Sequence, residues 1–223
     1  MELFQKADGG VLKSARAYPI AYNTAIKAGQ VVALTAGLVT LAAQKQTGAI
    51  LGVALENHSG TADALDPRAN GEEIMVCDAP DAIFRCAAPV FEATGGSATT
   101  VTTDELGAFS ADDFNGGLLV LIEKGASSAN TDALGTVKRI TDYAYTSTGT
   151  VSTFTVASGA TASNGDKFAL LPPIGFRKGQ LDSARAALNL ADTASLALKV
   201  VGYDPAERKV RLMANLHALG VED

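Results

Sequence analysis

The chain of 223 residues contains no tryptophan, and aromatic residues of all kinds make up only 6% of it. Cysteine and histidine, on which many catalytic and metal sites depend, occur only twice each. Alanine, by contrast, occurs 40 times and threonine 20 times, beside 22 glycines. A core of such small side chains buries less apolar area per residue than an aromatic core. Because association of several copies adds buried area, we expect a homo-oligomer.

The balance of charge and the hydropathy pattern argue against several classes of protein. Acidic residues number 24 and basic residues 18, which gives a formal net charge of −6. Non-specific nucleic-acid binding depends on Lys and Arg neutralising phosphates, so we expect no nucleic-acid partner. No run of about 18 apolar residues is present, so we also expect no membrane span. The first eight residues lack the apolar region of a secretory signal, so we expect no signal peptide.

The two cysteines do not form a disulfide framework. Cys77 and Cys86 flank a proline-containing turn at residues 78–81. In a tight hairpin Cys77 would lie opposite Ala82, and Cys86 opposite Glu73, so the two thiols would not face each other. We predict that both are free thiols in strands, as is typical of a reducing compartment.

Short apolar runs recur every eight to twelve residues between Gly, Asn, Asp and Pro, which indicates an all-β fold. Strands are predicted at residues 31–35, 38–41, 50–55, 73–77, 82–86, 117–122, 137–143, 150–156 and 167–171. The clearest hairpin spans residues 197–213, where Asp204 and Pro205 suit the first two positions of a type I turn. At most one short helix is expected, at residues 181–188, capped by Asp182 or Ser183.

Changes in composition along the chain suggest three parts. Residues 1–18 are predicted to form an extended N-terminal arm, with a frayed terminus as the alternative. Residues 19–93 are expected to form a small β-barrel or β-sandwich domain with long loops. Residues 94–223 form a second β-rich region, in which residues 94–116 are small and polar and are interpreted as a linker or long crossover.

The chemistry of known catalytic motifs is missing. The chain has no phosphate-binding glycine loop, dinucleotide fingerprint or nucleophile elbow. Adjacent carboxylates at residues 104–105 and 112–113 would point to opposite faces of an extended chain, so we interpret both pairs as solvated loops. The basic groups at residues 138–139 and 208–211 are interpreted as solvated strand faces, with contact to an acidic partner as the alternative. We predict no enzyme activity, no catalytic residue, no cofactor and no metal site.

Three segments carry a resemblance to a known family. They are residues 28–34 (AGQVVAL), 48–56 (GAILGVALE) and 71–76 (GEEIMV). Their order resembles that of the small β-domain of tailed-bacteriophage capsid decoration proteins, also called cement or head-stabilising proteins. Residues 114–124 (FNGGLLVLIEK) and 134–141 (LGTVKRIT) look similar to longer virion proteins of this kind. The resemblance covers residues 20–90 well and the remainder loosely.

The resemblance implies a structural, non-enzymatic virion protein. Such proteins bind the outer surface of the expanded capsid, often as trimers, and bridge neighbouring subunits of the major capsid protein. The expected location is therefore the capsid exterior, after synthesis in the cytoplasm of the host bacterium. The N-terminal arm of such proteins commonly contacts a neighbour, which makes Leu3, Phe4, Lys13 and Arg16 candidate capsid contacts, although no motif of the family specifies them.

Two alternatives remain at this point. One is another structural component of a phage, such as a head-fibre base or a tail protein, because the same composition serves either role. The other is a small all-β hydrolase acting on glycans, which would need two carboxylates about 5–10 Å apart across one cleft.

Overall fold

The fold is described from a computed structural model of residues 1–223. The description covers residues 2–6, 15–42, 48–59, 72–159, 161–182, 187–190, 198–214 and 218. Every regular element in these ranges is a β-strand, so the prediction of a mainly all-β chain is confirmed. Within the described ranges there is no helix long and apolar enough to cross a membrane.

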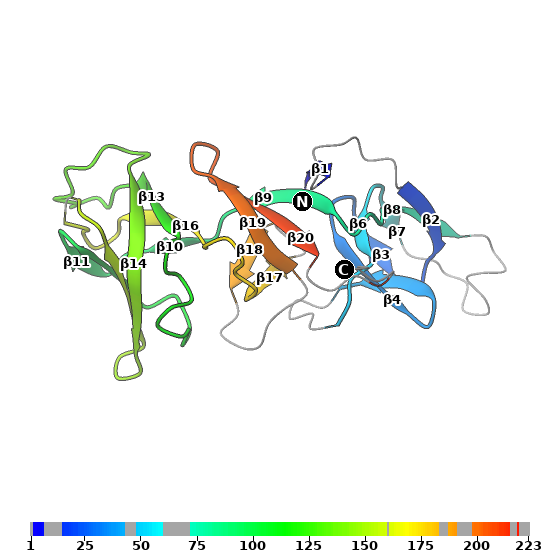
Figure 1. The fold of residues 1–223 in the computed structure, drawn as a ribbon, viewed down its shortest axis with the longest axis horizontal. Coiled ribbons are helices and arrows are strands. Elements are labelled where there is room, and N and C mark those ends of the chain that lie inside the picture. Colours follow the sequence, from blue (N-terminus) through cyan, green and yellow to red (C-terminus); the bar gives the residue numbers. More distant parts are fainter. Residues whose placement is uncertain are drawn as a thin grey trace.

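Three sheets follow one another along the longest axis of the molecule (Figure 1). The five-stranded sheet has the order β2 (Ala15–Pro19), β8 (Glu73–Cys77), β6 (Gly52–Ala54), β4 (Val31–Thr35) and β5 (Leu38–Leu41). The middle sheet has the order β17 (Gly179–Asp182), β18 (Ala187–Leu190), β9 (Ala82–Ala87), β20 (Lys209–Ala214) and β19 (Leu198–Asp204), and β1 (Glu2–Lys6) also pairs with β9. The seven-stranded sheet has the order β10 (Val90–Glu92), β16 (Lys167–Leu171), β13 (Leu118–Glu123), β14 (Val137–Thr146), β15 (Val151–Val156), β12 (Thr100–Thr103) and β11 (Gly95–Ser97). The short strands β3 (Ala25–Ile26) and β7 (His58–Ser59) form a separate pair.

One edge of the five-stranded sheet is a hairpin that the sequence predicts. Strands β4 and β5 pair antiparallel and are joined by Ala36 and Gly37, both at positive φ (51° and 78°) as a tight two-residue hairpin requires. The two edges of the sheet approach each other at one point, where Ile20 forms a parallel bridge with Val39. The strand path is therefore curled but not closed into a barrel.

Strand β9 is the central strand of the middle sheet. It pairs with β20 along one edge, and with β1 and β18 along the other. The β18 pairing, at Ala187 and Ala87, is parallel, whereas every other strand pair named above is antiparallel. Segments from both ends of the sequence are thus joined through residues 82–87.

The seven-stranded sheet encloses an aromatic core. Its members are Phe91, Phe109, Phe114, Tyr143, Phe154, Phe168 and Phe176, all buried. Phe91 of β10 stacks on Phe154 of β15, with 5.3 Å between ring centroids, although these strands lie near opposite ends of the strand path. The Thr103 hydroxyl also donates a hydrogen bond to the Glu92 carbonyl oxygen (2.7 Å). These contacts hold the two ends of the sheet together, although β10 and β12 do not pair as neighbouring strands.

The hairpin of β14 and β15 protrudes from this sheet (Figure 1). Its inner residues on β15 are Ser152, Phe154 and Val156, which alternate with partly exposed neighbours as the period-two pattern predicts. In β13, by contrast, Leu119, Val120 and Leu121 are all buried, as expected for a continuous apolar run.

The prediction of a helix at residues 181–188 is wrong. Leu181 belongs to β17 and Leu188 to β18, and the two residues are cross-strand partners in an antiparallel pair. Helix propensity is a weak preference over eight residues, and tertiary packing overrides it here. Leu188 is fully buried in the core, and Ala187 pairs with β9.

The sheets do not follow the expected division at residue 93. Strands β9 and β10 precede this position, yet they pair with β20 and β16, which follow it. The expected linker at residues 94–116 includes β11 and β12 and contributes Phe109 and Phe114 to the aromatic core. Within the expected arm, residues 2–6 and 15–18 are extended, but they form strands in two different sheets.

Both cysteines are free, buried and in strands, as predicted. The tight hairpin around residues 78–81 is not formed, because β8 pairs with β2 and β6 whereas β9 belongs to the middle sheet. Burial raises the pKa of the Cys86 thiol to about 12 and also raises that of Cys77. The neutral thiols therefore serve as small apolar core groups.

Replacing Phe114 by alanine is expected to destabilise the fold. Its ring lies 4.9 Å from that of Tyr143 and 5.0 Å from that of Phe109, between ring centroids. Removing a fully buried phenylalanine side chain costs about 3–5 kcal/mol in the free energy of unfolding. Chemical denaturation followed by far-UV circular dichroism measures this loss. The control is Val90→Ala on an exposed side chain, which should change stability by about 0.5 kcal/mol or less. Equal stability of the two variants would contradict the role of the aromatic core.

Candidate functional site

The structure places three of the four candidate contacts of the N-terminal arm, and these three lie on two strands. Leu3 and Phe4 lie in β1, where Leu3 is the cross-strand partner of Phe84 in the middle sheet. Arg16 lies in β2 of the five-stranded sheet. Lys13 lies outside the described residues. The structure therefore does not bring Leu3 and Phe4 onto the same sheet as Arg16.

Arg16 makes an ion pair at the end of its own sheet. Its Nε atom lies 3.5 Å from the Oδ2 atom of Asp78, whose side chain is completely buried. The Tyr18 hydroxyl donates a hydrogen bond to the same carboxylate. Burial and this hydrogen bond together raise the pKa of Tyr18 to about 12. These contacts fasten β2 to the segment that follows β8.

Three of the four adjacent carboxylates accept hydrogen bonds from other groups of the chain. Asp113 accepts from the Ser110 backbone N–H (2.7 Å) and from the Lys178 ammonium (2.5 Å). Asp112 accepts from the Asn115 side-chain amide (2.8 Å). Glu105 accepts from the Glu92 backbone N–H (3.2 Å). These hydrogen bonds give the carboxylates a structural role, because they hold the loops in place. No group of three or more His, Cys, Asp or Glu suited to a metal ion occurs in the described part of the chain.

An apolar groove lies between the seven-stranded sheet and the tip of the β19–β20 hairpin. Its volume is about 610 Å³, within the roughly 300–1,000 Å³ typical of ligand sites. The lining residues are Val120, Leu121, Ile122, Leu134, Gly135, Val137, Asp204, Pro205, Ala206 and Arg208. Leu134 is 62% exposed and Val137 is 45% exposed, so two large apolar side chains of this groove face solvent.

One wall of the groove is the tip of the predicted hairpin. The Asp204 carboxylate accepts from the backbone N–H groups of Ala206 (3.1 Å) and Glu207 (3.2 Å), which fixes the turn. Arg208 has a positive φ of 55° at the end of the turn. Its carbonyl oxygen accepts from the Ala88 N–H (3.0 Å), which fastens the tip to the segment that follows β9.

The other wall is the loop that leads into β14. The Gly135 N–H donates to the Leu121 carbonyl oxygen (2.8 Å), and the Leu121 N–H donates to the Thr136 carbonyl oxygen (3.0 Å). These two bonds hold Leu134 beside the end of β13. Both walls are thus supported by backbone hydrogen bonds of the chain itself.

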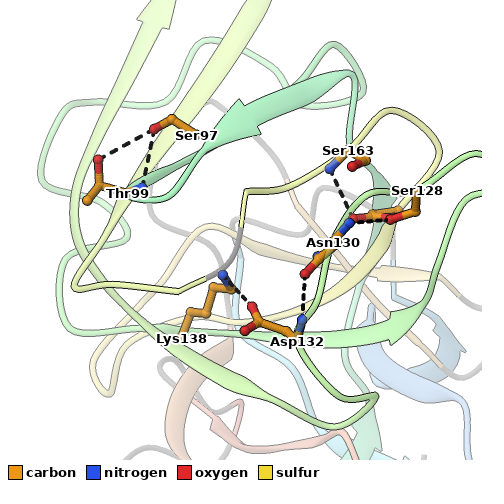
Figure 2. Close-up of polar contacts among 8 residues, drawn as sticks. Ser97, Thr99, Ser128, Asn130, Asp132, Lys138 and Ser163 are labelled. Carbon is orange, nitrogen blue, oxygen red and sulfur yellow. Dashed lines mark hydrogen bonds and ion pairs between the residues drawn. The ribbon is translucent and has the colours of Figure 1, made fainter.

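A polar network supports this loop from beneath (Figure 2). The Lys138 ammonium, buried at the start of β14, lies 2.7 Å from the Asp132 carboxylate. The Asp132 backbone N–H donates to the Asn130 side-chain oxygen (3.0 Å). The Asn130 amide in turn donates to the buried Asp166 carboxylate (2.8 Å). Lys138 is therefore not on a solvated strand face, as the sequence suggested, because its ammonium is paired inside the protein.

Asp166 is the centre of the network. Its carboxylate also accepts from the backbone N–H groups of Ser163 (3.0 Å) and Gly125 (3.0 Å). Burial acts to raise its pKa, but hydrogen bonds from Ser128, Ser163, Asn130 and Gly125 outweigh burial and lower the pKa below its usual range. The ionised carboxylate therefore holds three loop segments together.

No pattern in the sequence predicts the groove. In the sequence, the segment with Leu134 and Val137 stands out for its resemblance to virion proteins and as the start of a predicted strand. Residues 204–208 stand out as a turn that leads into a basic group. The one sequence feature that points to the groove is Leu134, a single large apolar residue in a loop otherwise made of small and polar residues.

Comparison with protein-family models, with curated protein sequences and with solved structures finds no match for this chain.

Replacing Asp166 by asparagine is expected to lower stability by about 1–3 kcal/mol at pH 7, because the amide group cannot accept the same set of hydrogen bonds. The pKa of Asp166 is lower in the folded state than in the unfolded state. Its stabilising contribution is therefore present above pH 4 and is lost as the pH falls through the folded-state pKa.

The difference between the wild type and Asp166→Asn should accordingly shrink in denaturation experiments between pH 7 and pH 3. Asp104→Asn, at an exposed carboxylate, is the matched control and should change stability by about 0.5 kcal/mol or less. A difference that stays constant down to pH 3 would contradict this role of the charge.

Proposed function

We propose that this chain is a structural binding protein rather than an enzyme. The groove supports this proposal, because its interior surface is mostly apolar and its two charged residues lie on the hairpin wall. Asp204 is the one acidic residue among those that line the groove, and its carboxylate is used within the turn, so the groove offers no pair of carboxylates for glycan hydrolysis. A groove whose walls are held by backbone hydrogen bonds and expose apolar side chains is suited to bind another macromolecule.

We infer that the protein binds the outer surface of a tailed-bacteriophage capsid and stabilises it by bridging neighbouring capsid subunits. The support is the resemblance of residues 28–34, 48–56 and 71–76 to capsid decoration proteins. These segments overlap β4, β6 and β8, which are adjacent strands of one sheet. The three segments that resemble the small β-domain of these proteins thus lie together in one sheet of this chain.

The elongated arrangement of the sheets is consistent with this role. The five-stranded and seven-stranded sheets occupy opposite ends of the molecule, with the middle sheet between them (Figure 1). Such a chain offers surfaces to two neighbouring subunits at once. Many copies on one shell would also make individually weak contacts effective through avidity.

Binding to assembled shells is the first expected outcome. Purified protein added to expanded particles that lack it should co-sediment with them and raise the temperature at which they release DNA. It should not bind free capsid subunits, because the bridged surface exists only on the shell. An unrelated acidic protein of similar size is the control. Absence of co-sedimentation, together with an unchanged release temperature, would contradict the proposed function.

A trimer in solution is the second expected outcome, because such proteins often act at positions of three-fold symmetry. Light scattering on a size-exclusion column should give three times the chain mass of 22.8 kDa. A mass equal to that of one chain at every concentration tested would contradict a trimer that forms before binding.

A further inference from the structure

We propose that the groove between Leu134 and Pro205 binds an apolar segment of the capsid subunit that carries a carboxylate beside its apolar residues. This inference rests on the proposed function and names the partner chemistry of the groove. Its basis is one juxtaposition: solvent-exposed apolar side chains on the sheet side, and an arginine on the hairpin side.

The apolar half of the groove favours a hydrocarbon side chain. Leu134 and Val137 lie on one wall, Pro205 and Ala206 form the other, and Val120 and Leu121 lie at the buried floor. Apolar area removed from water contributes about 25 cal/mol per Å², so a leucine-sized side chain seated here gains free energy without any polar contact. Apolar residues gathered in one groove on a soluble protein are typical of an interaction site.

The charged end of the groove selects a carboxylate. Asp204 and Arg208 are its two charged lining residues. The Asp204 carboxylate accepts two backbone hydrogen bonds within its own turn, whereas the exposed Arg208 side chain has no ion-pair partner among the described residues. A guanidinium pairs with a carboxylate through two parallel hydrogen bonds, which adds direction as well as attraction. The bound segment therefore carries Asp or Glu close to its apolar residues.

The walls are preformed, which reduces the entropy lost on binding. Backbone hydrogen bonds fix Gly135 to Leu121 and Arg208 to Ala88, while the Lys138–Asp132 ion pair supports the loop from within. The backbone of the groove therefore loses little conformational freedom when the partner segment binds.

Four single variants test the inference in the full-length chain. Leu134→Asp places a charge in the apolar half, and Arg208→Glu reverses the charge at the rim. Ile174→Asp is the matched control for the first, since Ile174 is 68% exposed and does not line this groove. Arg139→Glu, at an exposed arginine outside the groove, is the control for the second. Circular dichroism establishes that each variant is folded.

The measurement is the affinity of each variant for expanded particles that lack the protein. We expect the two groove variants to bind at least tenfold more weakly than the wild type, and the two controls to bind as the wild type does. If the wild type binds and the groove variants match their controls, the inference is wrong while the proposed function stands. If the wild type does not bind, both are overturned.

A photo-crosslinking residue in place of Val137 identifies the occupant. In the presence of particles, the expected product joins this position to a capsid peptide that contains apolar residues next to Asp or Glu. A product that joins two copies of this chain would overturn the inference in favour of a contact between copies, and a capsid peptide without a nearby carboxylate would overturn the role of Arg208.

Discussion

The pairing of strand β9 with three other strands is the constraint on which the rest of the fold depends. Residues 82–87 lie between β20 on one edge and β1 and β18 on the other, so this short segment joins parts of the chain that are more than a hundred residues apart. The strand also leads directly from the five-stranded sheet into β10 of the seven-stranded sheet. Both ends of the molecule are therefore positioned relative to a single strand, and the core is continuous across the three sheets.

The groove depends on this arrangement because its walls come from different sheets. Ala88, just after β9, holds the hairpin tip through the Arg208 carbonyl, while Phe176 joins the aromatic core to the middle sheet by accepting from the Val200 N–H (2.9 Å). Polar groups buried at Asp166 and Lys138 support the opposite wall. A chain with few aromatic residues thus concentrates its rings in one sheet, and uses hydrogen bonds where large side chains are lacking.

Local sequence patterns predicted most of the strands, but they could not predict contacts between segments that lie far apart in the sequence. The turn at Asp204 and the reversal at Ala36–Gly37 were recognisable because the required residue types stand next to each other. Residues 181–188 were misassigned because their strand pairing depends on β9, about a hundred residues earlier. The groove was missed for the same reason, since Leu134 meets Pro205 only in the folded chain. Burial of Lys138 likewise depends on the loop that folds over it.

The direction of β9 has a mechanical consequence. In Figure 1 this strand runs along the long axis of the molecule, between the two outer sheets. The hydrogen bonds of antiparallel strands lie perpendicular to the strands. Tension applied between the outer sheets therefore loads the bonds of β9 with β1 and β20 in shear, so that they share the force instead of opening one after another. A molecule built in this way resists stretching along its length much more than it resists peeling from the side.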